Sequence, residues 1–170
     1  MKKFPFFRQY DSMDCGPTCL KMISAYYGKN ISLQKLRELS FLTKEGVSLA
    51  GIYQAAESIG FRVMVLKIPT ITESEKFSVY SATLPCIVHW DQKHFIVVYK
   101  ITEKFVWIAD PSTGKLKITI ERFRQFYETN DGEGIAIIPE PTNQFYDNEF
   151  EKEPKLNFKF LFGYFRPYKK

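Results

Sequence analysis

The sequence predicts an α+β fold, because helical and extended patterns occupy separate parts of the chain. Up to Gly60, apolar residues recur at three- and four-residue spacing between capping and stop signals, as in amphipathic helices. After Gly60, β-branched and aromatic residues come in short runs separated by polar turns, as in strands. Helices followed by strands predict a mostly antiparallel sheet with the helices packed on it.

Three helices are expected in the first part of the chain. The first begins near Cys15 and ends before Gly28, the second begins at the cap residue Ser32, and the third extends from Ser48 to Gly60. Their expected inward-facing residues are Cys19, Met22, Ile23 and Tyr26, then Leu33, Leu36 and Leu39, then Leu49, Ile52, Tyr53, Ala56 and Ile59.

Six strands are expected after the helices. They cover about residues 61–68, 86–90, 95–101, 105–110, 115–120 and 134–138. Residues 91–93 form a hairpin loop between the second and third of these strands, and residues 112–114 form a similar turn. No internal repeat is visible.

One globular domain is expected over residues 1–140, since a chain of 170 residues with 45% hydrophobic content can bury a single core. A linker is expected at 141–154, where proline-rich sequence gives way to an acidic stretch. Residues 155–170 combine six aromatic residues with five Lys or Arg residues. This basic aromatic tail has the composition of a membrane interface, and the alternative is a disordered chain end.

The net charge of +5 does not indicate a nucleic-acid site. The whole excess lies in residues 155–170, because residues 1–154 carry 19 Lys and Arg against 19 Asp and Glu. A neutral globular part lacks the basic footprint of nucleic-acid binding.

Three cysteines without regular spacing favour a reducing, intracellular setting. No signal peptide and no apolar run of the roughly 20 residues that cross a bilayer is visible, so the chain as given is expected to be soluble.

Cys15 has the features of a reactive nucleophile. It stands where a helix is expected to begin, followed by Gly16 and by Pro17, whose missing N–H costs nothing in a first turn. The positive end of the helix macrodipole favours a thiolate at that position. By contrast, Cys19 and Cys86 are expected to be small buried hydrophobic residues.

An attacking thiolate creates an oxyanion, which needs hydrogen-bond donors. The backbone N–H of Cys15 is one candidate, and the side-chain amide of Gln9, in the loop before the helix, is the other. Asp14 is ambiguous, because it could cap the helix but its carboxylate would oppose ionisation of the neighbouring thiol.

The general base must be one of only two histidines. His94 directly follows a turn and opens an apolar strand, whereas His89 lies inside the preceding strand, where a packed histidine is more common. We therefore favour His94. Asp110 ends the next strand of the hairpin and could orient the imidazole, although Asp-Pro is also a common way to open a turn.

Residues 9–20, residues 94–99 and Asp110-Pro111 together resemble the C39 peptidase family, the bacteriocin-processing endopeptidases fused to the N-terminus of ABC exporters. The resemblance covers about residues 4–138. It implies a papain-like fold and cleavage of a leader peptide after a double-glycine-type site, coupled to export. Cys15 matches the family's nucleophile, His94 its general base, Asp110 the orienting residue and Gln9 the oxyanion donor.

The resemblance also implies the partners. These would be the leader of a secreted precursor peptide and the transmembrane and ATPase domains of the same exporter, expected as a homodimer with this domain at the cytoplasmic face of the bacterial inner membrane. The tail after residue 155 would lead toward the transmembrane domain. No cofactor is expected in this domain, and ATP and Mg²⁺ would belong to a nucleotide-binding domain. Gly114-Lys115 is followed by Leu116, where a phosphate-binding loop needs Ser or Thr.

Three alternatives stay open from the sequence. Cys15, Cys19, His89 and His94 could form a zinc site, since their spacing allows two pairs of ligands. The chain could also be a non-catalytic module that binds a leader helix on an apolar surface. The third alternative is another Cys-His-Asp enzyme, such as a transglutaminase-like or acyl-transfer enzyme.

Overall fold

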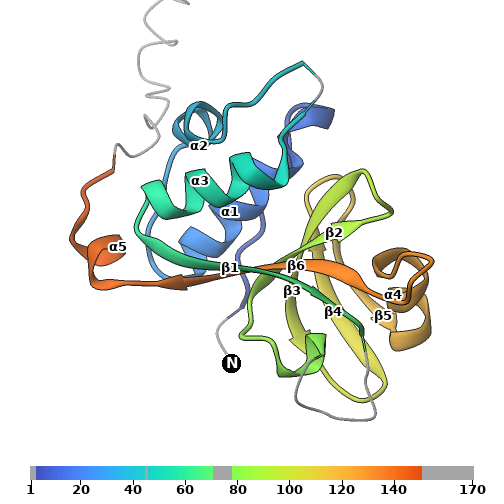
Figure 1. Ribbon diagram of the computed structural model, residues 1–170. Helices are drawn as coiled ribbons and strands as arrows, with labels where there is room; N and C mark the ends of the chain where they lie inside the picture. Colours follow the sequence, from blue (N-terminus) through green and yellow to red (C-terminus); the bar gives the residue numbers. More distant parts are fainter. Residues whose placement is uncertain (1–2, 45, 71–77, 151–170) are drawn as a thin grey trace, which may run out of the picture.

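The computed structural model describes residues 3–44, 46–70 and 78–150 of the chain, and it shows helices packed on both faces of one antiparallel sheet (Figure 1). The elements are η1 (Ser12–Asp14), α1 (Cys15–Tyr26), α2 (Leu33–Leu39), α3 (Leu49–Ser58), β1 (Phe61–Ile68), η2 (Val79–Ser81), β2 (Cys86–Trp90), β3 (His94–Ile101), β4 (Phe105–Asp110), β5 (Gly114–Thr119), α4 (Ile120–Tyr127), β6 (Gly134–Pro141) and α5 (Asn143–Asp147). The predicted α+β class is confirmed.

The three N-terminal helices begin and end where the sequence predicts. The hydroxyl of Ser32 accepts a hydrogen bond from the Lys35 N–H at 3.2 Å, and that of Ser48 accepts one from the Gly51 N–H at 3.0 Å. Gly28 and Gly60, just past α1 and α3, have φ values of 95° and 96°, which only glycine adopts without strain.

Two of the predicted inward-facing residues are placed differently. Tyr26 is 36% exposed and lies at the edge of the core, with its ring 5.5 Å from that of Phe4. Tyr53 is only partly buried and donates a hydrogen bond to Glu57 at its solvent-facing hydroxyl. Tyrosine often lies at the rim of a core, where its ring is packed and its hydroxyl can form a hydrogen bond. The helical spacing therefore did not distinguish residues at the rim of the core from residues at its centre.

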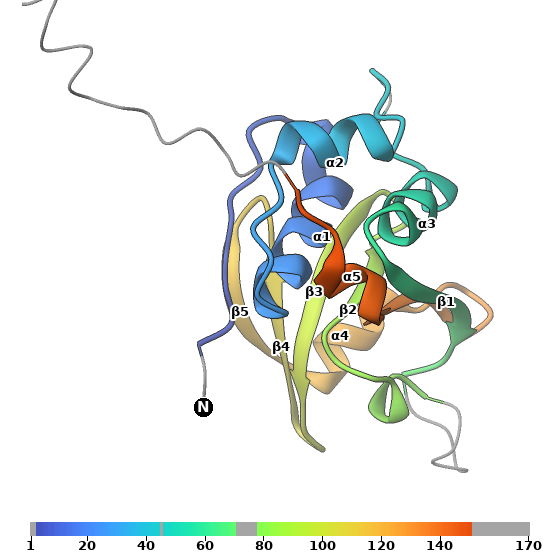
Figure 2. The same cartoon turned by 90° about the vertical axis from the view of Figure 1, so that its left-hand side faces the viewer.

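The sheet has the strand order β1-β6-β2-β3-β4-β5, and every neighbouring pair is antiparallel. α1 packs against the face formed by residues such as Phe95, Val97 and Ala109. The last strand, β6, lies between the edge strand β1 and β2. Figure 2 shows the helices α1, α2 and α3 together on one side, with α4 behind the sheet.

The helix α4 is absent from the sequence prediction, which assigned residues 115–120 to a strand and left the following residues unassigned. Ile120, Phe123 and Tyr127 are buried and recur at helical spacing, and the hydroxyl of Thr119 caps the helix. The helical pattern was therefore present, but it is only two turns long and directly follows a strand. α4 covers the second face of the sheet and completes a second apolar cluster there.

The expected linker at 141–154 is wrong in its first part. β6 extends to Pro141, and α5 packs against the domain through Phe145, which is fully buried and whose ring centroid lies 4.4 Å from that of Phe61. The backbone of Phe145 approaches Gly60 so closely that a Cβ there would lie 2.4 Å from it. The rest of the expected linker from residue 151, and the basic aromatic tail, lie outside the described residues.

Phe145→Ala should lower the free energy of unfolding by about 3–5 kcal/mol, because it removes a fully buried aromatic ring. Urea denaturation measures the change. Tyr146→Ala is the matched control, since its side chain is 50% exposed on the same short helix and its loss should cost little. Equal stability of the two variants would show that α5 is not part of the domain core.

Candidate active site

Cys15 is the first residue of α1 and lies at the boundary between the helices and the sheet. It is 6% exposed and belongs to the apolar cluster that joins α1 to the sheet. The neighbouring Gly16 makes room for the segment before α3, because a Cβ at this position would lie 2.4 Å from Val47 and 2.8 Å from Ile52. The helix start thus holds the thiol, and the missing side chain lets α3 pack beside it.

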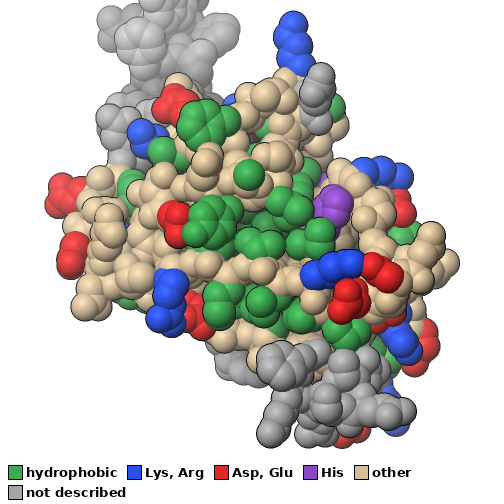
Figure 3. All heavy atoms as spheres, viewed as in Figure 1, with side chains coloured by type: hydrophobic (Ala, Val, Ile, Leu, Met, Phe, Trp, Pro, Cys, Tyr) green, Lys and Arg blue, Asp and Glu red, His purple; other side chains and the backbone are tan. Residues whose placement is uncertain are grey.

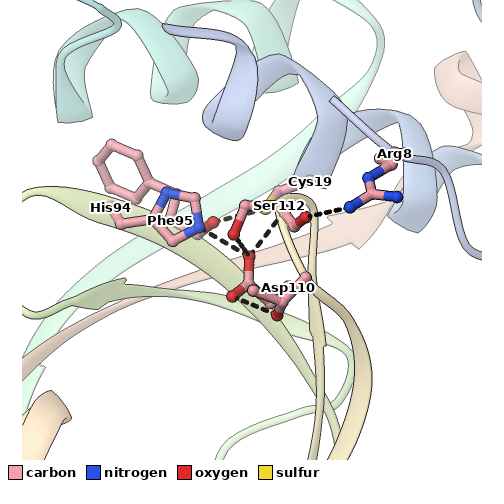
Figure 4. A network of polar contacts seen from close by, with 7 residues as sticks. Arg8, Cys19, His94, Phe95, Asp110 and Ser112 are labelled. Atoms are coloured by element: carbon pink, nitrogen blue, oxygen red, sulfur yellow. Dashed lines mark hydrogen bonds and ion pairs between the residues drawn. The ribbon is translucent and has the colours of Figure 1, made fainter. Parts of the chain in front are cut away.

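His94 and Asp110 come together at adjacent ends of β3 and β4. His94 Nε2 and Asp110 Oδ1 are 2.8 Å apart, as Figure 4 shows. The strand register explains the contact: Val97 pairs with Ala109, so the next residue of β4, Asp110, lies further toward the start of β3. The imidazole and the carboxylate are therefore fixed by the sheet rather than by a loop.

The turn after β4 holds the Asp110 carboxylate in place. Its Oδ1 accepts hydrogen bonds from the Ser112 backbone N–H and hydroxyl, both at 2.8 Å, and its Oδ2 accepts one from the Thr113 hydroxyl at 2.8 Å (Figure 4). Burial raises the pKa of Asp110, but the hydrogen bonds from His94, Ser112 and Thr113 outweigh it and hold this pKa well below its usual range. Asp110 is therefore an anion whenever the protein is folded near neutral pH.

His94 is the point where the thiol and the carboxylate meet. Burial lowers its pKa, but hydrogen bonds to Asp110 and Cys15 and their negative charges outweigh burial and raise the pKa to about 9. Because Nε2 faces Asp110, Nδ1 is the nitrogen left for the thiol. The raised pKa favours the imidazolium form of His94 near neutral pH, with the Cys15 thiol on one side of the ring and the Asp110 carboxylate on the other.

Gln9 lies beside the turn after β4, because backbone and side-chain hydrogen bonds of its N-terminal segment attach it there. Its backbone N–H donates to the Pro111 carbonyl at 3.0 Å, and the preceding Arg8 donates to the Ser112 carbonyl at 3.2 Å (Figure 4). The side-chain Oε1 of Gln9 is buried and has no hydrogen-bond partner among the described residues. The N-terminal segment thus runs along the turn that carries Asp110, with an uncommitted amide next to the site.

Asp14, which the sequence left ambiguous, does not cap α1 with its side chain. Its fully buried carboxylate instead accepts hydrogen bonds from Arg37 of α2, at 2.7 Å and 2.5 Å, and from the Asp11 N–H at 3.0 Å. Burial raises the pKa of Asp14, but the contacts to Arg37 and to the backbone outweigh it and lower the pKa overall. No local sequence pattern indicates this pairing, because Arg37 lies 23 residues from Asp14 along the chain.

The other candidate residues are not brought into the site. His89 packs its ring 5.0 Å from that of Phe95, and burial and the charge of His94 lower its pKa. Cys19 donates to the Phe95 carbonyl, and burial raises its pKa well above the usual value. Burial also raises the pKa of Cys86, to about 12. Both thiols are fully buried packing residues, as predicted.

A zinc site finds no support in the arrangement of these residues. Cys19 points to a backbone carbonyl, and Nε2 of His94 is committed to Asp110. Over residues 3–44, 46–70 and 78–150, no group of three or more His, Cys, Asp or Glu side chains could hold a metal ion. The same part of the chain holds no helix with the length and apolar character that spanning a membrane requires.

Comparison with known proteins decides the family. Residues 3–144 match the model of the peptidase C39 family. The chain belongs to the peptidase C39 family. The expected resemblance, the papain-like fold and the classification as a cysteine peptidase are thereby confirmed.

The curated relatives of this C39 domain are much longer proteins. The lactococcin-G-processing and transport ATP-binding protein LagD of Lactococcus lactis subsp. lactis is 37% identical over 85% of this chain and 20% of its own length. The transport/processing ATP-binding protein ComA of Streptococcus pneumoniae is 31% identical over 88% of this chain and 20% of its own length. The chain therefore spans about a fifth of the length of these relatives.

Solved C39 domains match the fold almost end to end. A double glycine motif protease from an AMS/PCAT transporter, crystallised in complex with the leader peptide, has a TM-score of 0.71 and 29% identity, with 82% of this chain and 93% of that chain covered. The peptidase domain of Streptococcus ComA has a TM-score of 0.71 and 30% identity, with 82% and 100% covered. The match thus extends over 93% and 100% of the length of these two solved chains.

The raised pKa of His94 predicts how peptidase activity depends on pH. If His94 is the expected general acid–base, kcat/KM should fall as pH rises through about 9, because the imidazolium that would donate a proton to the leaving group is lost. Asp110→Asn removes the negative charge and leaves burial to lower the pKa of His94, so this alkaline limb should move to lower pH. Initial rates of peptide cleavage across the pH range measure the alkaline limb of the wild type and that of Asp110→Asn.

Asp147→Asn is the control for this change, because Asp147 is an exposed carboxylate on α5. It should leave the pH profile of the wild type unaltered. An alkaline limb in Asp110→Asn that coincides with the wild-type limb would show that Asp110 does not stabilise the imidazolium.

Proposed function

We propose that this domain is an endopeptidase that removes the leader from a secreted peptide precursor by cleavage after a double-glycine-type site. The observation that carries the proposal is the position of His94 between Cys15 and Asp110, within a chain of the C39 family. The related double glycine motif protease was crystallised with a leader peptide, and LagD and ComA are described as processing and transport proteins. These likenesses supply the substrate class.

In the proposed reaction, the Cys15 thiolate attacks the carbonyl carbon of the second small residue. The oxyanion accepts hydrogen bonds from the Cys15 N–H and the Gln9 side-chain amide, while Asp110 keeps the imidazolium oriented. His94 gives its proton to the leaving amine, which breaks the peptide bond and leaves an acyl-enzyme. His94 then takes a proton from water and the hydroxide attacks the thioester carbonyl. The leader leaves as a carboxylic acid, and the Cys15 thiolate and the His94 imidazolium are restored.

The polar atoms around the site fit these roles. The Gln9 amide has no competing hydrogen bond through its buried Oε1, so its orientation is free to be set by the substrate. Asp110 already receives three hydrogen bonds besides the one from His94, so it remains charged while the imidazole changes its protonation state. The chemistry uses only backbone and side-chain groups of this domain and water, and we propose that it needs no cofactor.

The leader also needs a surface outside the reactive centre. Figure 3 shows hydrophobic side chains gathered on the face that carries β1. Met64, Val65 and Leu66 of β1 are between 38% and 44% exposed, which is unusual for an edge strand. Met64 and Leu66 share one face of β1 and Val65 lies on the other, so the exposed edge strand is apolar on both sides and would suit the apolar face of an amphipathic leader helix laid along it.

The setting of the domain follows from its relatives and is part of the proposal. LagD and ComA are ATP-binding transport proteins, more than four times the length of this chain. We infer that the domain belongs to an ABC exporter, acts at the cytoplasmic face of the inner membrane, and is present twice in a homodimeric exporter. ATP and Mg²⁺ would then be bound by a separate ATPase domain.

A non-catalytic leader-binding module is the second candidate function, because the family likeness and the exposed β1 surface would serve it equally well. Cys15→Ala separates the two. Cleavage of a precursor peptide that ends its leader in Gly-Gly should be lost, while its binding to the domain, measured by fluorescence anisotropy, should persist. Cys86→Ala is the matched control, since Cys86 is buried in β2 and should affect stability rather than cleavage.

Precursor that is not cut by the wild-type domain, although it binds tightly, would favour the binding module. Cleavage by Cys15→Ala at the wild-type rate would refute Cys15 as the nucleophile.

Gln9→Ala should lower kcat by roughly 10²–10³-fold with little change in KM, because one oxyanion donor acts mainly in the transition state. Steady-state cleavage kinetics, followed by mass spectrometry, measure both constants. Gln54→Ala is the control, since Gln54 is an exposed glutamine on α3. An unchanged kcat in Gln9→Ala would remove Gln9 from the mechanism.

A further inference from the structure

A buried carboxylate directly precedes the proposed nucleophile, and the reaction described above does not use it. The side chain of Asp14 has no solvent exposure. An anion at this place opposes formation of a thiolate on the next residue, and its burial limits screening by water. A cysteine peptidase with such a neighbour needs something that cancels the charge.

Arg37 supplies that charge from α2. Its Nε donates to Asp14 Oδ1 at 2.7 Å and its Nη2 donates to Oδ2 at 2.5 Å, which is the two-point geometry that guanidinium and carboxylate form best. The Arg37 side chain is 35% exposed, so it keeps part of its hydration while it pairs with a fully buried carboxylate. α2 is packed against α1, which fixes the distance between the two groups.

The same carboxylate closes the turn that joins the two proposed oxyanion donors. Asp14 Oδ2 accepts from the Asp11 N–H at 3.0 Å, and Asp11 Oδ1 accepts from the Met13 N–H at 3.0 Å. This reciprocal pair of bonds forms η1, with Gln9 just before it and Cys15 just after it. The guanidinium therefore holds the segment that sets how far apart the Gln9 amide and the Cys15 N–H lie.

We propose that Arg37 is a positioning residue of the catalytic centre, because it cancels the buried charge of Asp14 beside Cys15 and locks the turn that carries the nucleophile. The proposal rests on the proposed role of Cys15 as the nucleophile. The titratable groups that interact with the thiol are His94 from β3 and Cys19 from α1, and Asp110 from β4 interacts with both of these. Asp14, paired with Arg37, directly precedes Cys15 in the chain.

Arg37→Met tests the proposal, because it leaves the buried carboxylate without its cation. The acid limb of the pH profile of kcat/KM should move up by about one pH unit, since an unbalanced anion makes the thiolate harder to form. At neutral pH, kcat should fall by roughly tenfold with KM changed less than twofold, as for a loss confined to the reaction step. The pH dependence of Cys15 alkylation by iodoacetamide should shift in the same direction.

The double variant Arg37→Met with Asp14→Asn separates charge from structure. Asparagine keeps an oxygen for the Asp11 N–H but carries no charge, so the acid limb should return to its wild-type position. Arg62→Met is the matched control, because Arg62 pairs with Glu140 at the surface with 73% of its side chain exposed. It should leave the pH profile and the alkylation rate unchanged.

A wild-type acid limb in a folded Arg37→Met protein overturns the proposal, and so does a double variant whose limb stays shifted. Should Arg37→Met fail to fold, Arg37→Lys replaces it: this variant keeps the charge but loses the two-point contact, so kcat should fall with the acid limb in place. A shifted limb in Arg37→Lys contradicts the charge argument. The alkylation profile needs no substrate, so it tests Arg37 even if the proposed leader peptidase activity proves wrong.

Discussion

The contact between His94 and Asp110 is the constraint on which the rest of the site depends. It joins the ends of two neighbouring strands, so the imidazole is held by the register of the sheet. The turn after β4 then secures the carboxylate through Ser112 and Thr113 and binds the segment that carries Gln9. The imidazole and the carboxylate are therefore both held at the same end of the neighbouring strands β3 and β4.

The thiol itself belongs to a different layer, and the packing of α1 on the sheet brings the two parts together. α1 contacts β3 more than any other strand, and Cys19 is hydrogen-bonded to the Phe95 carbonyl one turn below Cys15. A shift of this helix along the sheet would separate sulfur from imidazole. The apolar cluster under α1 thus stabilises the fold and sets the geometry of the reaction at once.

Charge is balanced around this junction on both sides of Cys15. His94 interacts with Cys15 as a cation that is stabilised by Asp110. The buried anion Asp14 forms an ion pair with Arg37. The two ion pairs come from four different elements, and each has one partner that is almost completely buried. Such pairs are weak evidence for stability, because desolvation offsets their attraction, but they fix orientation strongly.

The sequence by itself determined the helices before Gly60, the strands, and the three separate blocks that carry Cys15, His94 and Asp110, because local patterns and short motifs record local backbone preferences. It also limited the base to two histidines. Only the tertiary structure decided that Phe145 belongs to the core, that α4 covers the far face of the sheet, and that Asp14 pairs with Arg37. Each of these depends on contacts between residues distant in the chain, and no local pattern in a single sequence encodes such contacts.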